Sequence, residues 1–436
     1  MQVQLEQLAS LRNAGTPCGI FSVCSAHPVV LRAALRHGRE TGSTVLIEAT
    51  CNQVNHQGGY TGMAPANFAA LVFDIANDED CPPKLIVLGG DHLGPNPWRS
   101  LPAESAMAEA AAMVSAYVSA GFRKIHLDTS MGCANEPDAL GDAITANRAA
   151  MLARVAEEVS KQMDGAMPLY IIGTEVPPPG GADHVLDSIT PTNAVAAIRT
   201  LDIHRNAFHK AQLHLAFDRA IGLVVQPGVE FGNSNVIRYN RDNANDLIQV
   251  LNCESSKIFE AHSTDYQGLQ TLTKLVEDGF AILKVGPELT FVLREALYAL
   301  DLIATDLLPG YGNRPLYHAM EEIMLTKPEY WESHYVGDSA STCMLRHYSL
   351  SDRIRYYWAM PEAKQAVDRL MACLRGQRLP LPLLFQHLPG ATHFADTPLQ
   401  PEEVLIWRIG QSLATYHAAC KINYRGRHPL TVNPNK

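Results

Sequence analysis

An acid and an imidazole stand side by side where an apolar stretch of the sequence ends. Residues 85–88 are apolar, two glycines follow, and Asp91 and His92 come next, before a Gly-Pro pair. Apolar runs of this length are typical of buried strands, and Gly-Pro pairs are typical of turns. In parallel α/β enzymes, ligands bind at the carboxyl ends of the strands. We therefore expect Asp91 and His92 to lie at a binding site.

Polar side chains also follow most of the other apolar runs that we interpret as strands. Seven of the eight runs end in His27, Glu48, Asp91 with His92, Asp128, Glu175, Gln226 with Glu230, or His262 with Asp265. Each of these residues alone is equally compatible with a turn or a helix cap. A ring of buried acids and imidazoles, however, is costly unless a metal, a substrate or mutual pairing neutralises it. The set indicates that a charged ligand binds there.

Two imidazoles and one carboxylate in this set are a common combination at open sites for zinc and other transition metals. We predict His92, Glu230 and His262 as ligands of a divalent metal, although they come from different runs and form no local motif. The alternative is that both histidines are hydrogen-bonded inside the fold and that Glu230 caps a turn. His126 shares a strand face with Asp128 by alternation, and we interpret it as a supporting or core residue.

Asp91, beside a metal-bound His92, would suit a general acid or base. Its alternative roles are a salt bridge to Arg99 or a cap on the following loop. We predict Asp128 and Glu175 as further catalytic groups. Substrate binding falls to His27, Glu48, Asn52, Gln53, Gln226 and Asp265. Lys284 sits two residues short of its strand end, and a Schiff-base role for it is the less favoured hypothesis.

Eight apolar runs, each followed by a helical pattern, must position these residues. They cover 19–24, 44–48, 85–92, 124–128, 169–175, 222–226, 257–262 and 280–286. Strands that alternate with helices pair in parallel through right-handed crossovers, and eight such units close as a (β/α)8 TIM barrel. The alternative is an open doubly wound sheet, but no Gly-x-Gly-x-x-Gly turn follows the first run. We predict a barrel over residues 1–290.

A helical C-terminal extension is predicted for residues 291–436. Helical patterns cover 293–307 and 315–325, and a further helix is predicted to start at Ser351 with Asp352 in its first turn. We expect this extension to pack on a barrel face or to make a subunit contact.

Composition limits the partners and the compartment that we expect. The chain has 436 residues, a net charge of −10 and 47% hydrophobic residues. Nucleic acids and membrane surfaces both require a basic face, so we expect neither as a partner. The nine cysteines form no CxxC pair, and no signal peptide or apolar run of membrane length is evident. We therefore expect a reducing cytoplasm.

A series of motifs along nearly the whole chain resembles the Z-subunit family of D-tagatose-1,6-bisphosphate aldolase. The motifs are 24–28 (CSAHP), 46–50 (LIEAT), 52–55 (NQVN), 58–62 (GGYTG), 89–95 (GGDHLGP), 173–177 (GTEVP), 225–230 (VQPGVE), 260–267 (EAHSTDYQ), 284–287 (KVGP) and 351–358 (SDRIRYYW). The resemblance implies a TIM barrel and a place in galactitol and N-acetylgalactosamine breakdown. The family has also carried a tagatose-6-phosphate kinase label, but the sequence lacks a Gly-rich phosphate loop followed by Lys-Ser/Thr.

More distantly, the barrel resembles the metal-dependent class II aldolases. That resemblance implies acid or base chemistry for Asp91, and a metal held by His92, Glu230 and His262. A glutamate stands where that family has an imidazole, which bears on the identity and affinity of the metal. The family's Gly-rich phosphate loop after the seventh strand is replaced by residues 263–265. Arg353 and Arg355 are therefore our candidates for phosphate binding.

Two functional hypotheses follow. In the first, the chain is a metal-dependent enzyme, with zinc, manganese or nickel, that acts on a ketohexose or its 6-phosphate by retro-aldol and aldol steps at C3–C4. It would then be a 4-epimerase that interconverts tagatose and fructose forms, as members of the resembled family do, or an aldolase. In the second, the chain is a non-catalytic subunit that stabilises a catalytic aldolase subunit. We also expect a homo-oligomer.

Overall fold

Eight parallel strands close into a barrel in this computed structural model, which describes residues 3–163, 165–173 and 189–421. The order around the barrel follows the chain, with the last strand beside the first. The strands are β1 Ile20–Val23, β2 Val45–Thr50, β3 Ile86–Leu93, β4 Lys124–Leu127, β5 Leu169–Ile172, β6 Ala220–Val225, β9 Ile258–Ala261 and β10 Phe280–Val285. All eight predicted strands are present, which confirms the (β/α)8 barrel.

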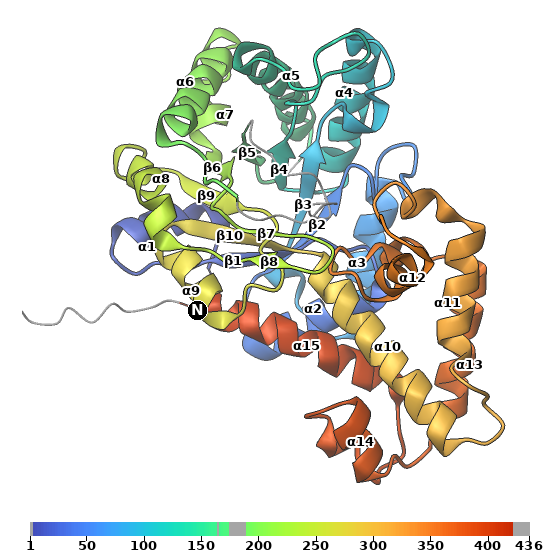
Figure 1. Ribbon diagram of the computed structural model, residues 1–436. Coiled ribbons are helices and arrows are strands. Elements are labelled where there is room, and N and C mark those ends of the chain that lie inside the picture. The colour runs from blue at the N-terminus through green and yellow to red at the C-terminus, as the bar shows by residue number, and fades with distance from the viewer. Residues whose placement is uncertain (1–2, 164, 174–188, 422–436) are drawn as a thin grey trace, which may run out of the picture.

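Helices surround the barrel, and a small antiparallel hairpin follows β6 (Figure 1). The hairpin is β7 Glu230–Phe231 and β8 Val236–Ile237, and the helices are α1 Leu8–Asn13, α2 Pro28–Thr41, α3 Pro65–Asp78, α4 Ala103–Ser119, α5 Asp142–Lys161, α6 Ala194–Lys210, α7 His214–Asp218, α8 Arg241–Cys253 and α9 Leu269–Glu277. Helix α2 shows how local sequence sets these boundaries: His27 caps its start, Pro28 follows, and Gly42 ends it with φ of 63°.

The barrel interior has an apolar layer below and a charged layer above. The apolar layer contains Leu46, Leu169, Ile171, Val224, Ile258 and Ile282, and α1 packs Leu8 against it. The charged layer contains Glu48, Lys124, Glu260 and Lys284, all buried. A filled barrel floor is usual for this fold, since layers of inward side chains pack it. The charged layer therefore lies between the packed floor and the open end of the barrel.

The C-terminal region returns to the barrel through its last described helix. It contains α10 Pro287–Leu307, α11 Pro315–Thr326, α12 Ser339–Tyr348, α13 Pro361–Leu374, α14 Leu381–His387 and α15 Pro401–Cys420. Helix α15 packs between α9 and α2 (Figure 1). Cys420 accepts a hydrogen bond from Gly19 N (3.0 Å), and the Tyr416 hydroxyl donates to the Thr264 carbonyl (2.7 Å). The barrel wall thus includes a helix from the far end of the chain, and the predicted boundary at residue 290 falls inside α10.

The segment predicted to form a helix from Ser351 instead forms a short 3-10 helix, η5 Arg353–Tyr356. Asp352 precedes it with φ of 48° and does not cap it. Its carboxylate accepts hydrogen bonds from Thr290 (2.6 Å) and Arg294 (3.2 Å) on α10. Asp352, which was expected in the first turn of a helix, therefore attaches the segment to α10 through these buried donors.

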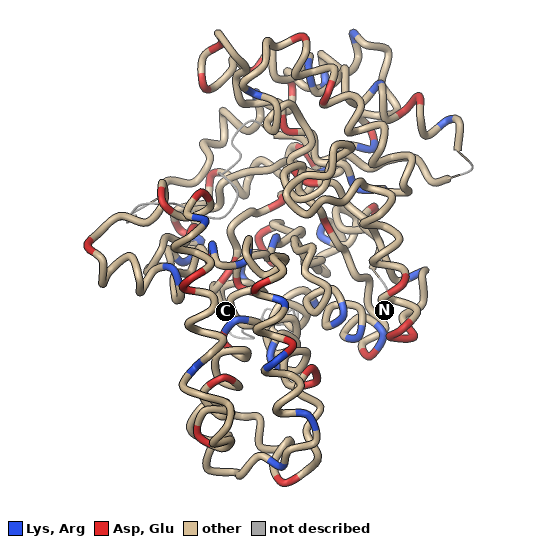
Figure 2. The backbone as a smooth tube through the Cα atoms, turned by 90° about the vertical axis from the view of Figure 1, so that its right-hand side faces the viewer, with Lys and Arg blue, Asp and Glu red and all other residues tan. Residues whose placement is uncertain are grey.

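Acidic and basic residues are interspersed along the backbone, as the view in Figure 2 shows. None of the described helices combines the length and the apolar composition needed to cross a membrane.

A substitution of Gly94 tests how closely the chain after β3 packs against the end of β4. A Cβ built on Gly94 would lie 1.6 Å from the Asp128 carbonyl oxygen, so the chain after β3 passes against the end of β4. We expect Gly94→Ala to lower the free energy of unfolding by about 1–3 kcal/mol or more, because the two backbones must separate. Gly310→Ala is the control, since a Cβ there meets nothing within 4 Å. Denaturant unfolding of both variants measures this, and equal stabilities would contradict the close packing.

Candidate active site

A network of ion pairs lies inside the barrel beneath its open end. The Lys124 ammonium is 2.6 Å from Glu260 Oε2 and also contacts Glu48. The Lys284 ammonium is 2.5 Å from Glu48 Oε2. Gly89 provides the room, since a Cβ there would lie 2.7 Å from Glu48 Cγ. Two ammonium groups and two carboxylates thus compensate one another in a place that excludes water.

The electrostatics of this layer keep both lysines charged. Burial alone would lower the pKa of Lys124, but the Glu260 and Glu48 carboxylates outweigh burial and raise the pKa above its usual range. The same competition raises the pKa of Lys284, with Asp91 as the largest contributor among the surrounding groups. Asp91 Oδ1 lies 2.5 Å from the Lys284 ammonium. The lysine therefore links the charged layer to the residues above it.

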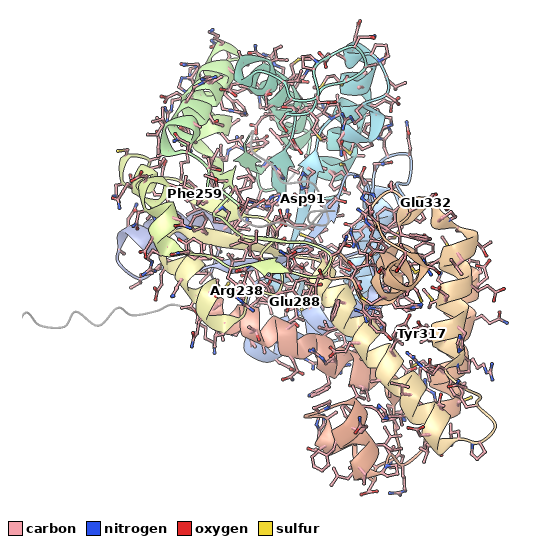
Figure 3. The ribbon with its side chains drawn as sticks, viewed as in Figure 1. Asp91, Arg238, Phe259, Glu288, Tyr317 and Glu332 are labelled. Atoms are coloured by element: carbon pink, nitrogen blue, oxygen red, sulfur yellow. The ribbon has the colours of Figure 1, made fainter. Side chains whose placement is uncertain are left out.

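Three imidazoles gather above the charged layer. The ring centroids of His92, His126 and His262 are 5.0 Å, 5.0 Å and 5.3 Å apart. With Asp91 they form a buried cluster in which one ligating atom from each residue lies within 4.8 Å of the others. Figure 3 shows Asp91 on β3, within the ring of strands. The cluster has the composition of a metal site.

Each imidazole is held by a carboxylate. His92 Nδ1 donates to Asp128 Oδ2 (2.9 Å), and His262 Nε2 lies 3.0 Å from Glu260 Oε1. His126 Nδ1 lies 2.8 Å from Asp91 Oδ1, whereas its buried Nε2 has no hydrogen-bond partner among the described residues. Carboxylates in such positions orient the rings of metal-binding histidines. The arrangement leaves one nitrogen of His126 available to a cation.

Two of the three imidazoles, those of His92 and His262, have opposite pKa shifts. Burial, aided by Lys284, lowers the pKa of His262 to about 3, so its ring is neutral at neutral pH. Burial also acts on His92, but Asp91 and Asp128 outweigh it and raise its pKa. Burial opposes ionisation of Asp128 as well, yet His92 holds its pKa well below the usual range. The two carboxylates thus favour the protonated, positively charged form of the His92 ring.

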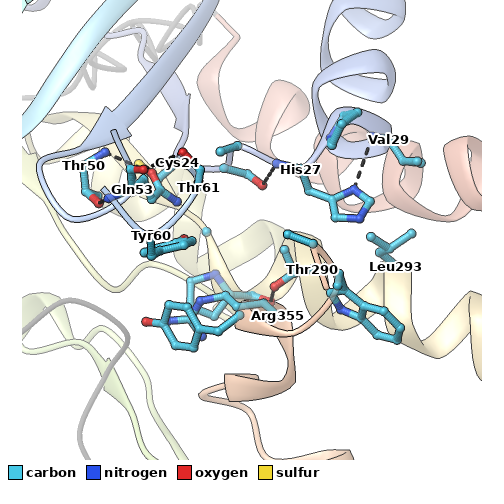
Figure 4. Close-up of a pocket in the computed structure, with 18 of the residues that line it drawn as sticks. Cys24, His27, Val29, Thr50, Gln53, Tyr60, Thr61, Thr290, Leu293 and Arg355 are labelled. Carbon is cyan, nitrogen blue, oxygen red and sulfur yellow. Dashed lines mark hydrogen bonds between the residues drawn. The ribbon is translucent and has the colours of Figure 1, made fainter. Parts of the chain in front are cut away.

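A cavity of about 630 Å³ opens above the cluster. Of the residues predicted from the sequence, it is lined by His27, Asn52, Gln53, Asp91, His92, His262, Asp265 and Arg355. Figure 4 shows His27, Gln53 and Arg355 around it, on different segments of the chain. Asp265 also accepts hydrogen bonds from Gly286 N (3.0 Å) and Glu288 N (2.8 Å), so it caps the start of α10 as well.

The other predicted residues that the structure describes do not line the cavity. Glu48 pairs with Lys124 and Lys284 beneath the cluster. Asp128 accepts a hydrogen bond from His92. Gln226 Oε1 accepts from Gly228 N and Val229 N in a tight turn. The Arg353 guanidinium donates to the Tyr330 carbonyl (3.0 Å). Glu175 lies outside the described residues.

Glu230 is not brought into the cluster with His92 and His262. Its carboxylate accepts from Phe231 N (3.0 Å) and from the Ser263 side chain, and burial raises its pKa to about 7. The β7–β8 hairpin holds it in this position, whereas β4 brings His126 into the cluster. Two of the three predicted metal ligands therefore lie together, and the third neighbour is His126.

Sequence reasoning missed the roles of Lys124 and Glu260. The available signal was a charged residue within an apolar strand, two positions before a histidine in both cases: Lys124 before His126, and Glu260 before His262. Alternation places both members of each pair on one strand face. The proposed salt bridge of Asp91 to Arg99 is not formed, since Arg99 donates to Asp138 (3.1 Å).

A closed parallel barrel with a buried cluster of imidazoles and acids at its open end defines a (β/α)8 protein of the kind that binds small ligands at the carboxyl ends of its strands. The family model described as "D-tagatose-1,6-bisphosphate aldolase subunit GatZ/KbaZ-like" matches residues 5–421. The chain belongs to this family.

Two proteins that are similar to this chain are a named relative and a protein of known crystal structure. A protein of Agrobacterium fabrum (strain C58) named D-tagatose 6-phosphate 4-epimerase is 56% identical over 428 residues, which are 98% of this chain and all of the relative. A crystal structure of a "probable tagatose 6 phosphate kinase" from Sinorhizobium meliloti 1021 has a TM-score of 0.85 and 50% identity. It matches over 92% of this chain and 100% of that chain.

The charged layer predicts a large stability effect for a single substitution. Lys124→Met keeps most of the side-chain volume but removes one of the two ammonium groups that compensate Glu48 and Glu260. The other, Lys284, also pairs with Asp91. We expect the free energy of unfolding to fall by about 3–5 kcal/mol, the usual result of removing one partner from a buried ion pair. Denaturant unfolding at neutral pH measures the change.

Lys274→Met on the exposed face of α9 is the matched control, with an expected change of about 0.5 kcal/mol or less. A Lys124→Met variant as stable as this control would show that the charged layer does not hold the barrel interior together.

Proposed function

We propose that this protein is a metal-dependent 4-epimerase that interconverts tagatose 6-phosphate and fructose 6-phosphate by retro-aldol and aldol steps. The observation that carries the proposal is the cluster of three imidazoles and Asp91, of which Asp91, His92 and His262 line a cavity of about 630 Å³. The name of the A. fabrum relative, D-tagatose 6-phosphate 4-epimerase, supports the substrate and the reaction.

The residues of the cluster fit a divalent cation. His92, His126 and His262 would hold it, and the buried Nε2 of His126, which has no partner among the described residues, supports this assignment. Imidazole ligands suit zinc and nickel, while manganese prefers more oxygen ligands, which Asp91 would supply. A bound cation would polarise the substrate carbonyl and stabilise the negative charge of an enediolate. The proposal differs from the sequence-based ligand set in having His126 in place of Glu230.

Asp91 is the group that we assign to proton transfer. Burial alone would raise its pKa, but His92 and Lys284 outweigh burial and keep the pKa well below the usual range. The ionised carboxylate lines the cavity and accepts the proton of the C4 hydroxyl. The C3–C4 bond then breaks and leaves an aldehyde and a three-carbon enediolate. Rotation of the aldehyde, addition to its other face and return of the proton give the C4 epimer.

Lys284 has a supporting role in this scheme. Its ammonium contacts both Asp91 and Glu48 at 2.5 Å. A Schiff base requires a neutral amine, and these carboxylates favour the charged form. Lys284 therefore fixes the Asp91 carboxylate and compensates its charge, and it does not act as a nucleophile.

A second candidate function rests on the family description, which names an aldolase subunit. In that case the chain would stabilise a catalytic subunit without turning over substrate. Co-expression with such a subunit distinguishes the two: co-purification and a raised melting temperature of the catalytic subunit support the second function.

The direct test is to incubate the purified chain with tagatose 6-phosphate and Mn²⁺, Zn²⁺ or Ni²⁺. We expect fructose 6-phosphate to accumulate until equilibrium, and chelation of the metal to stop the reaction. Asp91→Asn should lower kcat by about 100-fold or more, because general-base catalysis contributes that much. Absence of conversion with all three metals would exclude the epimerase.

Metal analysis tests the ligand assignment. We expect His126→Ala and His92→Ala to lose metal, with an affinity at least about tenfold weaker, since even the outer partners of ligands matter to that extent. Glu230→Gln should retain it. Elemental analysis after dialysis measures the metal content. If Glu230→Gln loses the metal and His126→Ala keeps it, the result would support Glu230 as the third ligand, as predicted from the sequence, in place of His126.

A further inference from the structure

Three cationic side chains line the cavity: Lys284, Arg355 and Lys364. Lys284 is compensated by Asp91 and Glu48, as described above. Neither Arg355 nor Lys364 forms an ion pair with any residue in the part of the chain that the structure describes, whereas most other arginines of the protein do. Two positive charges thus face the cavity without forming an ion pair to a carboxylate of the described residues.

Arg355 is fixed by neutral groups. Its Nη1 donates to the carbonyls of Ser351 and Asp352, and Nη2 donates to the Tyr356 hydroxyl (2.8 Å). The guanidinium carbon also lies 4.4 Å from the centre of the Tyr356 ring. These contacts use three of its five N–H donors and leave Nε–H and one Nη2–H without an acceptor among the described residues. In Figure 4 the side chain lies below Tyr60, beside the cavity.

Lys364 approaches the same cavity from α13, on its exposed rim. No described residue accepts a hydrogen bond from its ammonium. Its charge adds to burial in lowering the pKa of His27 to about 4, so it lies near that ring. His27 Nδ1 accepts from Val29 N (3.3 Å) and caps α2. Lys364 and the start of α2 therefore both border the cavity.

Besides Asp91, two carboxylates line the cavity, and neither forms an ion pair with Arg355 or Lys364. Asp265 is turned towards the start of α10, where it accepts two backbone hydrogen bonds. Asp368 stands one helical turn after Lys364 on α13, but the two side chains form no ion pair. The positive charges of Arg355 and Lys364 are therefore available to a ligand that enters the cavity.

We propose that Arg355 and Lys364 form the site for the phosphate group of a ketohexose 6-phosphate, which rests on the function proposed above. A preorganised guanidinium that offers two N–H donors suits phosphate oxygens, and a lysine adds a second charge. The sugar carbons then extend to Asp91, His92 and His262, which line the same cavity. Residues of the C-terminal region would thus select phosphorylated over unphosphorylated substrates.

The test is calorimetric binding of tagatose 6-phosphate, unphosphorylated tagatose and inorganic phosphate to the full-length chain. For Arg355→Gln we expect the affinity for tagatose 6-phosphate to fall by about 10-fold to 100-fold, as for a lost charged hydrogen bond. This loss should exceed any loss for unphosphorylated tagatose by about tenfold or more. Inorganic phosphate should protect the wild type from thermal unfolding and protect Arg355→Gln far less.

Two further variants make the outcome decisive. Arg353→Gln is the matched control, because that guanidinium donates to Tyr330 outside the cavity lining. Lys364→Met lies on the exposed rim, so it tests the subsite even if Arg355→Gln fails to fold. The proposal is overturned if Arg355→Gln and Lys364→Met bind the phosphorylated sugar and phosphate as the wild type does. It is also overturned if they weaken both sugars equally. If the wild type binds tagatose 6-phosphate more tightly than tagatose but does not convert it, the proposed function would be refuted. The proposed phosphate site would then still be supported.

Discussion

Charge compensation inside the barrel is the constraint on which the rest of the site depends. Lys124 is fully buried, and it is tolerated there only because Glu48 and Glu260 share its charge. Both carboxylates then hold a second group: Glu48 pairs with Lys284, and Glu260 lies against His262. Each residue of this network thus has its position set by at least two others. The orientation of the cluster above it follows from that arrangement.

The site also depends on residues far apart in the chain. The cluster is assembled from β3, β4 and the end of β9, and the cavity above it is completed by the segment around η5 and by α13. Asp352 attaches η5 to α10, while α15 ties the C-terminal region to the barrel wall between α9 and α2. The segments beyond the last strand therefore contribute to the cavity lining. They form one wall of the cavity that the barrel alone would leave open.

Much of the scaffold could be predicted from the sequence, because it is determined by local patterns. Apolar runs and their spacing gave all eight strands, and the polar residues after them located the open end, including Asp91, His92 and His262. The membership of the buried cluster was harder to predict, because the side-chain directions at strand ends depend on turns. Glu230 follows β6 in sequence, but the hairpin β7–β8 turns its carboxylate to Phe231 and Ser263. Arg353 and Arg355 are two residues apart, yet in a 3-10 turn only Arg355 lines the cavity.

We propose that the carboxylates in contact with the three imidazoles hold His92, His126 and His262 around one divalent cation. Anomalous diffraction from crystals soaked in Mn²⁺ or Zn²⁺ tests it most directly. We expect a single strong anomalous peak among the three imidazoles, at about 2.0–2.3 Å from their nitrogen atoms. A peak bound by Glu230 and remote from His126, or no peak at the open end of the barrel, would contradict it.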